Sequence, residues 1–232
     1  MQPIYQTLLQ HIVDEAMHQK DILGILLIGS VARGDALPGA DLDLRFILAP
    51  GVSRKAEPEV RQGILIERGY ADMAHAQSKL ATNPMKIYNY LDGHILFDPE
   101  GLLAQLKEQA IQRFETYQYT KQERESIAYW LRSARLKMNV ALAASDILKA
   151  AFVATTTSWE ILVGLWAVND KPMPPNSSVW FHFKDLSKVP SNTEGVLQRL
   201  FCGETLVRIH TAIDLIDWML PYLDTVKQME GN

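Results

Sequence analysis

An apolar fraction of 47% over 232 residues is enough to bury a core, which excludes a disordered or low-complexity chain. The formal net charge of −4 argues against a protein whose main affinity is for the phosphate backbone of nucleic acid, so no nucleic-acid partner is expected. A single cysteine, Cys202, excludes an internal disulfide, and its apolar helical surroundings predict a small core residue. The first residues show no basic region followed by an apolar run, so we expect a cytoplasmic protein.

The first elements of the chain predict a sheet with a glycine turn. Residues 3–20 place apolar side chains at helical spacing, so a helix is expected to precede the sheet. Residues 22–28 are apolar at nearly every position, as in a strand that is covered on both faces. Gly29 and Ser30 follow this strand and predict a turn into a short helix. Residues 41–47 then alternate between polar and apolar side chains, which is typical of a half-buried strand.

This alternation places two carboxylates on one face of the second strand. Side chains two residues apart in a strand point the same way, so Asp41 and Asp43 are expected to lie side by side. Adjacent carboxylates repel each other unless a cation lies between them, and hard oxygen ligands suit Mg²⁺. Gly29 allows the backbone to approach a ligand, and the N–H and hydroxyl groups of Ser30 are placed to bind an anion. The stretch is therefore predicted to bind a metal ion and a triphosphate.

Other phosphate-binding motifs do not fit this stretch. Gly29 and Gly34 have Walker A spacing, but Asp35 and Ala36 stand where Lys and Ser or Thr are required, and no G-x-G-x-x-G occurs. The order of Gly-Ser, a short helix and Asp-x-Asp instead resembles the nucleotidyltransferase superfamily, which includes DNA polymerase beta and the aminoglycoside and lincosamide nucleotidyltransferases. The resemblance extends to about residue 115. The alternative, an ordinary sheet with two solvated aspartates, does not explain the order and spacing of these elements.

The resemblance implies a reaction and a set of roles. An acceptor hydroxyl would attack the α-phosphate of a nucleoside triphosphate, with ATP as the expected donor, and pyrophosphate would leave. Asp41, Asp43 and a third carboxylate would hold two Mg²⁺ ions, while Gly29 and Ser30 would contact the phosphates. Arg33 lies inside the motif turn, where it either braces the loop or contacts a phosphate.

The third carboxylate is predicted in a strand over residues 63–70. Glu67 lies inside this β-rich run, whereas Asp72 falls where the chain turns into the next helix. An odd number of residues separates them, so only one can face the metal site in a regular strand. We assign Glu67 to the site and keep Asp72 as the alternative. Residues 93–103 then predict a short strand and a helix start, with Asp98 as a helix cap.

The pattern changes after residue 120, where apolar residues recur every three or four positions and no alternating strand occurs. Helices are expected over residues 121–142, 145–168, 177–187, 193–202 and 204–228. Lys149 and Glu160 make the second of these a core helix, so no membrane partner is expected. The predicted fold is α+β, with a mixed-sheet nucleotidyltransferase domain over residues 1–117. An all-α helical bundle over residues 118–232 follows, and it is expected to bind the acceptor or to form a homodimer.

The bundle is expected to supply groups that the first domain lacks. We expect basic side chains of the first bundle helix to contact the triphosphate, which carries several negative charges, although a solvated helix face explains them equally well. These side chains are Arg132, Arg135 and Lys137. Glu160 lies in an apolar run that would raise its pKa, so it is the first candidate for the general base, with Glu125 next. Aromatic residues of this half either line an acceptor pocket or pack in the core, namely Trp159, Trp166, Trp180 and Phe181.

Three functions share this predicted site. The first is an enzyme that modifies a small hydroxylated acceptor, as the antibiotic-modifying nucleotidyltransferases do. The second is a protein-modifying enzyme or a toxin–antitoxin component, and the third is an inactive nucleotide-binding module. The attached bundle favours the first, because the minimal protein-modifying forms lack one. The intact Asp41 and Asp43 pair speaks against the third.

Overall fold

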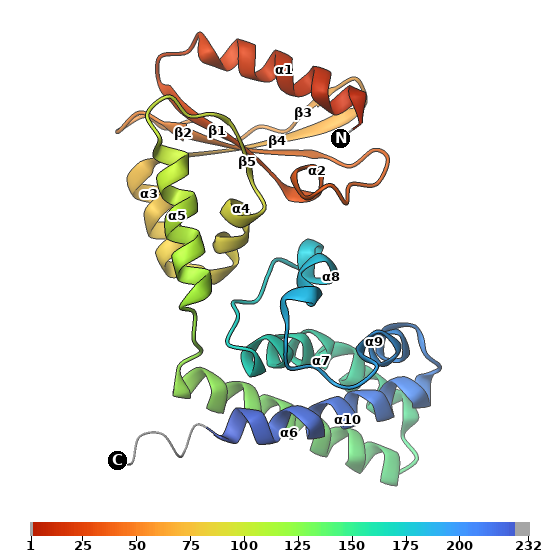
Figure 1. The fold of residues 1–232 in the computed structure, drawn as a ribbon. Coiled ribbons are helices and arrows are strands. Elements are labelled where there is room, and N and C mark those ends of the chain that lie inside the picture. The colour runs from red at the N-terminus through yellow and green to blue at the C-terminus, as the bar shows by residue number, and fades with distance from the viewer. Residues whose placement is uncertain (1, 226–232) are drawn as a thin grey trace, which may run out of the picture. The chain divides into compact units, whose positions relative to one another are not determined.

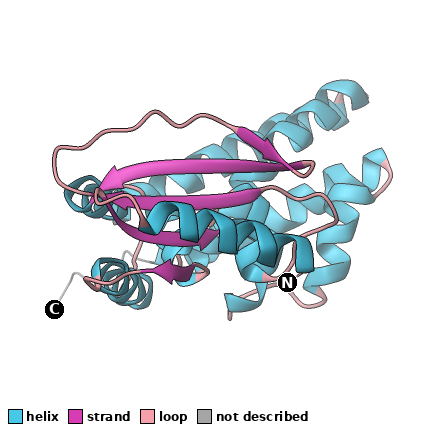
Figure 2. Ribbon diagram, turned by 90° about the horizontal axis from the view of Figure 1, so that it is seen from above, coloured by secondary structure: helices cyan, strands magenta, loops and turns pink. Residues whose placement is uncertain are grey.

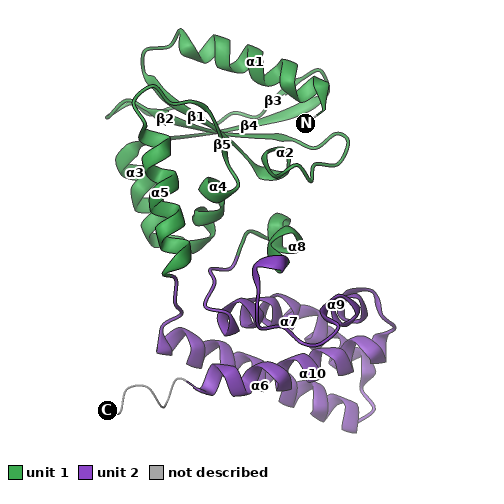
Figure 3. Ribbon diagram, in the orientation of Figure 1, with its two compact units in different colours: residues 1–116, 174–183 green, residues 117–173, 184–232 purple. Residues whose placement is uncertain are grey.

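The structure is a computed structural model that describes residues 2–225. It divides into two compact units (Figure 3). Unit 1 contains the residues up to Thr116 together with Pro174–Phe183. Unit 2 contains Tyr117–Met173 together with the residues from Lys184 onwards. A segment from the second half of the sequence therefore belongs to the compact unit formed by the first half.

Unit 1 is built on a mixed five-stranded sheet in the order β3-β4-β2-β1-β5 (Figure 1). Only the central pair, β2 and β4, is parallel, and every other neighbouring pair is antiparallel. The strands are β1 (Ile22–Ile28), β2 (Leu42–Leu48), β3 (Glu59–Arg61), β4 (Ile64–Asp72) and β5 (His94–Phe97). The strands expected over residues 22–28, 41–47 and 63–70 are thus present, and the predicted mixed-sheet fold class is confirmed.

Helix α1 (Pro3–Met17) covers one face of the sheet, as Figure 2 shows from above. Its buried side chains form one core cluster with alternate residues of β2, which are Leu42, Leu44 and Phe46. The intervening residues Asp43, Arg45 and Ile47 point to the other face, where Asp43 and Arg45 are only half-buried and Ile47 is buried. The alternation in the sequence therefore separates a packed face from a face that carries polar side chains.

The opposite face of the sheet is partly covered by four helical elements (Figure 1). They are α3 (Met73–Thr82), the 3-10 turn η1 (Pro84–Lys86), α4 (Ile87–Leu91) and α5 (Leu102–Glu115). The N-cap residue of α5 is Gly101 and not Asp98 as predicted, but the Asp98 carboxylate accepts hydrogen bonds from the backbone N–H groups of Leu103 and Ala104 at 3.1 and 2.9 Å and so stabilises the first turn. α3 begins directly after Asp72, which pairs with Leu48, so it starts at the end of β2 away from Asp43.

Unit 2 is helical. Its elements are α6 (Lys121–Ala143), α7 (Ile147–Val168), α9 (Thr193–Cys202) and α10 (Thr205–Asp224). The predicted helices over 121–142, 145–168 and 193–202 are confirmed within a few residues, and the end predicted at residue 228 lies outside the described residues. Trp166 is fully buried, so it belongs to the core, whereas Cys202 is exposed and the prediction of a core cysteine was wrong. Among residues 2–225 no single helix is long and apolar enough to cross a membrane; only two segments of α7 together pass that test, and they are bent by 46°.

The helix predicted over residues 177–187 does not form. The chain there makes three short turns, which are η2 (Asn176–Ser178), α8 (Val179–His182) and η3 (Phe183–Asp185). Ser178, Val179, His182 and Leu186 are buried at the spacing of one helix face, so the periodicity behind the prediction is present although the chain forms separate turns. The first two turns belong to unit 1, whereas the residues from Lys184 onwards belong to unit 2.

Candidate functional site

Three carboxylates meet at one end of the parallel strand pair. In the register of β2 and β4, Asp43 lies opposite Glu67. Asp41 immediately precedes β2 and, two residues from Asp43, shares its face. A carboxylate oxygen from each residue lies within 4.8 Å of the others. No other trio of His, Cys, Asp or Glu side chains in residues 2–225 has this proximity, so we call these three residues the acidic cluster.

The acidic cluster is electrostatically unfavourable without a cation. Partial burial raises the pKa of the Asp43 carboxyl above its ordinary value, and the negative charges of Asp41 and Glu67 raise it further. Arg45 and Arg33 act in the opposite direction but do not reverse the shift. Three carboxylate oxygens at this spacing are a donor set that suits a hard divalent cation such as Mg²⁺. The residues present therefore fit a metal ion.

Asp72, the alternative third carboxylate, is the N-cap residue of α3. Its Oδ1 accepts a hydrogen bond from the backbone N–H of His75 at 2.8 Å, which caps the first turn of α3. Asp72 pairs with Leu48 at the far end of β2, whereas Glu67 pairs with Asp43. The geometry therefore brings Glu67, and not Asp72, into the acidic cluster.

The glycine turn lies directly against Asp43. β1 ends at Ile28, which pairs with Asp43, and α2 (Gly29–Arg33) begins at the next residue. Gly29 has a φ of +75°, and a β-carbon there would lie 2.3 Å from Oδ2 of Asp43. Only glycine allows both this backbone conformation and this close approach. The helical turn expected after Gly29 and Ser30 is confirmed, and it is in contact with the acidic cluster.

The loop that carries Asp41 is held from the other side of the sheet. The hydroxyl of Tyr5, a residue of α1 that is 1% exposed, donates a hydrogen bond to the carbonyl oxygen of Ala40 at 2.9 Å. Because Ala40 precedes Asp41 directly, this bond limits the positions that the Asp41 backbone can adopt. Tyr5 and Ala40 are 35 residues apart, so no local pattern in the sequence indicates this bond.

Arg33 braces the motif helix, which was one of the two roles expected for it. Its side chain is only 5% exposed, and its Nε lies 3.2 Å from a carboxylate oxygen of Asp35. Its Nη2 donates a hydrogen bond to the carbonyl oxygen of Ser177 at 3.3 Å, and its guanidinium carbon lies 5.7 Å from the centre of the Phe181 ring. Arg33 thus ties α2 to the segment Pro174–Phe183 within unit 1.

Asp92 contacts Arg33, and His182 contacts Asp92. Oδ2 of Asp92 lies 4.0 Å from Nη1 of Arg33 and 3.0 Å from Nε2 of His182. The side chains of Asp92 and His182 are 10% and 6% exposed, and the His182 ring centre is 4.4 Å from that of Tyr88. Sequence reasoning missed both residues, because nothing in the sequence near either residue indicates that they meet.

The candidate residues of unit 2 are placed differently from the expectation. Arg132 pairs with Asp224 at 2.6 Å and Arg135 pairs with Asp217, so two of the three expected phosphate contacts link α6 to α10. Lys137 and Glu160 line a groove of about 430 Å³ between α6 and α7. Glu160 is exposed, so the buried environment expected to activate it is absent, and Glu125 is also exposed. Their roles as phosphate contacts and general base stay predictions.

Comparison with known proteins identifies the first half of the chain. The family model described as a nucleotidyltransferase domain matches residues 12–127. A crystal structure of a nucleotidyltransferase-like protein from Exiguobacterium sibiricum 255-15 aligns with 96% of this chain and 79% of its own, at 16% identity and a TM-score of 0.45. No match was found among curated proteins.

Proposed function

The chain belongs to the nucleotidyltransferase-domain family, and on that basis we propose that it transfers a nucleoside monophosphate, with ATP as the first donor to test, to an acceptor hydroxyl. The observation that carries the proposal is the acidic cluster of Asp41, Asp43 and Glu67 directly against the Gly29 turn. Transfer from a triphosphate needs ligands for the metal ions and a backbone turn that can contact the phosphates. The acidic cluster and the Gly29 turn would supply these two at one strand end.

The acidic cluster would hold the metal. Three carboxylate oxygens within 4.8 Å of one another offer the hard ligands that Mg²⁺ prefers, and the repulsion on Asp43 favours cation binding. Bound there, two Mg²⁺ ions would neutralise part of the triphosphate charge and lower the pKa of the attacking hydroxyl. Gly29 and Ser30 would contact the phosphates through their backbone N–H groups and the Ser30 hydroxyl.

The transfer exchanges the phosphoanhydride bond between the α- and β-phosphates for a phosphate ester bond to the acceptor. The acceptor oxygen forms a bond to the α-phosphorus, and the bond from that phosphorus to the oxygen bridging the β-phosphate breaks. Pyrophosphate leaves with the electron pair of the broken bond, and the proton of the hydroxyl passes to a carboxylate or to water. The residues of unit 1 bind and orient the donor for this step, and Glu160 stays the first candidate for the base.

The acceptor is proposed to carry a free hydroxyl group. A small hydroxylated molecule, of the type that antibiotic-modifying nucleotidyltransferases use, is the first candidate, and a protein hydroxyl is the second. An inactive nucleotide-binding module is the weakest alternative, because all three carboxylates of the acidic cluster are present and close together.

Donor binding and transfer can be tested separately. Thermal unfolding with ATP, GTP, CTP or UTP plus Mg²⁺ reports binding, because a ligand that binds only the folded state raises the midpoint. Pyrophosphate release with panels of hydroxylated acceptors then reports transfer. We expect one nucleotide to stabilise the wild type only with Mg²⁺, and Asp43→Asn to lose this effect. Stabilisation that is equal with and without Mg²⁺, or equal in Asp43→Asn, would contradict the proposal.

A further inference from the structure

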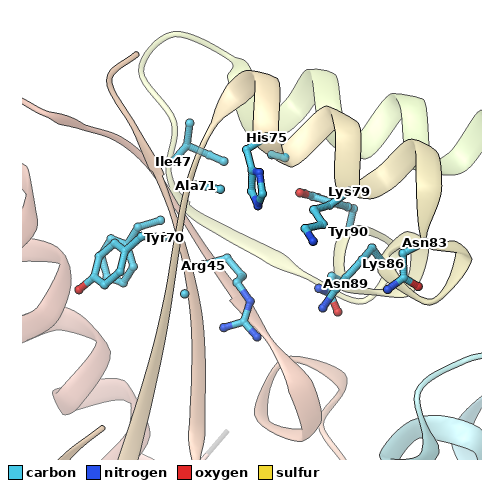
Figure 4. A pocket seen from close by; sticks show the side chains of 13 residues that line it. Arg45, Ile47, Tyr70, Ala71, His75, Lys79, Asn83, Lys86, Asn89 and Tyr90 are labelled. Atoms are coloured by element: carbon cyan, nitrogen blue, oxygen red, sulfur yellow. The ribbon is translucent and has the colours of Figure 1, made fainter. Parts of the chain in front are cut away.

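A pocket of about 300 Å³ lies beside the acidic cluster, between the sheet and helices α3 and α4 of unit 1. Its floor includes Arg45, two residues beyond Asp43 on β2, and Gly69, two residues beyond Glu67 on β4. Side chains two apart on a strand share a face, so the pocket and the acidic cluster lie on the same face of the sheet. Figure 4 shows Arg45, His75, Lys79 and Lys86 on this side, with Tyr70 pointing to the other.

The pocket has cationic side chains on its floor and wall but no acidic one. Arg45 comes from the floor, Lys79 from α3 and Lys86 from η1, and no Asp or Glu is among the residues that line the pocket. Within residues 2–225, none of these three forms a salt bridge with a carboxylate. Burial lowers the pKa of the Lys86 ammonium, and the positive charges of Arg45 and Lys79 lower it further. Three positive side chains therefore lie together in this pocket, and no carboxylate among residues 2–225 forms a salt bridge with them.

Arg45 is held in place at the pocket floor. Its Nη1 donates a hydrogen bond to the carbonyl oxygen of Leu44 at 3.0 Å. The side chain lies flat across β4, because a β-carbon on Gly69 would be 2.8 Å from Nη1 and 2.9 Å from Cδ of Arg45. Asn83, Asn89 and Tyr90 add polar groups to the opposite wall. Fixed cations with neutral hydrogen-bonding groups around them suit a phosphate or a carboxylate.

The position of the pocket relative to the acidic cluster indicates whether it binds the donor or the acceptor. α2 begins where β1 ends, next to Asp43, whereas the pocket begins at Arg45 and extends along β2 toward Ile47. In-line transfer needs the nucleophile and the leaving pyrophosphate on opposite sides of the α-phosphate. If the β- and γ-phosphates lie over the α2 turn, the pocket is on the side from which the acceptor approaches.

We infer that this pocket, with Arg45, Lys79 and Lys86 as its cations, binds a phosphate or carboxylate group of the acceptor. The assignment to the acceptor rests on the proposed function, whereas the preference for an anion rests on the pocket alone. It also separates the acceptor classes, because an uncompensated cluster of cations repels a polycationic acceptor such as an aminoglycoside. The acceptor is therefore a hydroxylated molecule that carries an anionic group.

Lysine reactivity tests this inference without requiring turnover. The full-length protein is treated with trace acetic anhydride at pH 8, and acetylation of each lysine is measured by mass spectrometry. Lys20, which is exposed and outside the pocket, is the internal control. We expect Lys86 to react faster than Lys20, and glycerol 3-phosphate or glycerate to slow labelling of Lys86 and Lys79 about tenfold at saturation, since charge-assisted hydrogen bonds are strong. Glycerol and Mg²⁺-ATP are expected to leave Lys86 labelling unchanged.

Two outcomes would overturn the inference. Equal protection by Mg²⁺-ATP would assign the pocket to the donor, and protection by neither anion would exclude an anion site. Asp43→Asn separates this test from that of the proposed function. This variant should lose Mg²⁺-dependent ATP binding yet keep the protection of Lys86 by the anion. Retained ATP binding in Asp43→Asn would contradict the proposed function and leave the anion result standing.

A second readout uses variants of the pocket lysines. Glycerol 3-phosphate is expected to raise the unfolding midpoint of the wild type and of Lys20→Gln. The same probe should have at most about a tenth of the wild-type affinity for Lys86→Gln or Lys79→Gln. Unchanged affinity in both pocket variants would show that the anion binds elsewhere.

Discussion

The backbone of Gly29 lies against the carboxylate of Asp43, so closely that a β-carbon on Gly29 would be 2.3 Å from Oδ2. The turn proposed to contact the phosphates and a residue proposed to hold the metal are therefore one packed unit. A shift of either must move the other. This contact explains why a glycine and an aspartate 14 positions apart in the sequence are needed together.

Gly29→Ala should abolish activity, and Gly34→Ala is its matched control. Both glycines have positive φ, +75° and +84°, so each alanine should cost about 1–2 kcal/mol of unfolding free energy. Only at position 29 does the new methyl group meet Asp43, since nothing lies within 4 Å of a β-carbon at position 34. Urea unfolding and Mg²⁺-dependent nucleotide binding measure the two effects. Equal loss of nucleotide binding in both variants would show that backbone strain alone matters.

Asp43→Asn should stabilise the metal-free protein at neutral pH. The folded-state pKa of Asp43 is raised above the ordinary value of 3.8, so the folded state holds the proton to higher pH than the unfolded state does. The unfolding free energy therefore falls as the pH rises between these two pKa values, and the full penalty is present at pH 7. Asparagine removes the charge and with it the penalty. Thermal unfolding in EDTA should show a higher midpoint for the variant at pH 7 and a difference that shrinks as the pH falls toward 3.8.

Mg²⁺ should reverse the order of the unfolding midpoints of the wild type and Asp43→Asn. Excess Mg²⁺ should stabilise the wild type and have little effect on Asp43→Asn, because a bound cation removes the repulsion among the three carboxylates. A wild-type midpoint that is insensitive to Mg²⁺, both alone and with nucleotide, would argue that the acidic cluster is only a solvated strand end.

Glu67→Gln and Asp72→Asn should have opposite effects. Glu67 faces Asp43 across the parallel pair, so its loss should lower transfer by orders of magnitude with little change in stability. Asp72 caps α3, so its loss should cost about 1 kcal/mol of unfolding free energy and leave transfer intact. Single-turnover transfer and urea unfolding, measured on both variants, check this. Loss of transfer in Asp72→Asn alone would reverse the assignment.

Arg33→Met should destabilise unit 1 through the contacts of Arg33 with Ser177 and Asp92. Removing a nearly buried guanidinium that donates to a carbonyl should cost about 1.5–3 kcal/mol. Lys55→Met is the matched control, since the pair of Lys55 with Glu57 is exposed and should contribute at most about 1 kcal/mol. Urea unfolding compares the two variants. Equal stabilities would show that the segment Pro174–Phe183 does not brace α2.

Local patterns carried most of what could be predicted. The strand period placed Asp41 and Asp43 on one face, and the resemblance to the nucleotidyltransferase superfamily supplied the third carboxylate, Glu67, on a neighbouring strand. The same period separated Glu67 from Asp72. These inferences needed no knowledge of distant contacts, which is why the sequence sufficed for them.

Long-range packing explains what could not be predicted. Arg45, Lys79 and Lys86 come from a strand, a helix and a turn, and only the folded sheet brings them to one pocket. His182 follows Asp92 by 90 residues, so their pairing leaves no local pattern. The burial of Glu160 was mispredicted for a related reason: its neighbours in the sequence are apolar, but its own position on α7 is exposed.

Binding of Mn²⁺ in the presence of a non-hydrolysable ATP analogue tests the central claim most directly. Electron paramagnetic resonance counts free Mn²⁺, which replaces Mg²⁺ at oxygen ligands, and needs no acceptor. The wild type and Asp72→Asn should bind Mn²⁺ together with the analogue, and Asp43→Asn and Glu67→Gln should bind it at least about tenfold more weakly. Wild-type Mn²⁺ affinity in both Asp43→Asn and Glu67→Gln would contradict the assignment of the acidic cluster as the metal site.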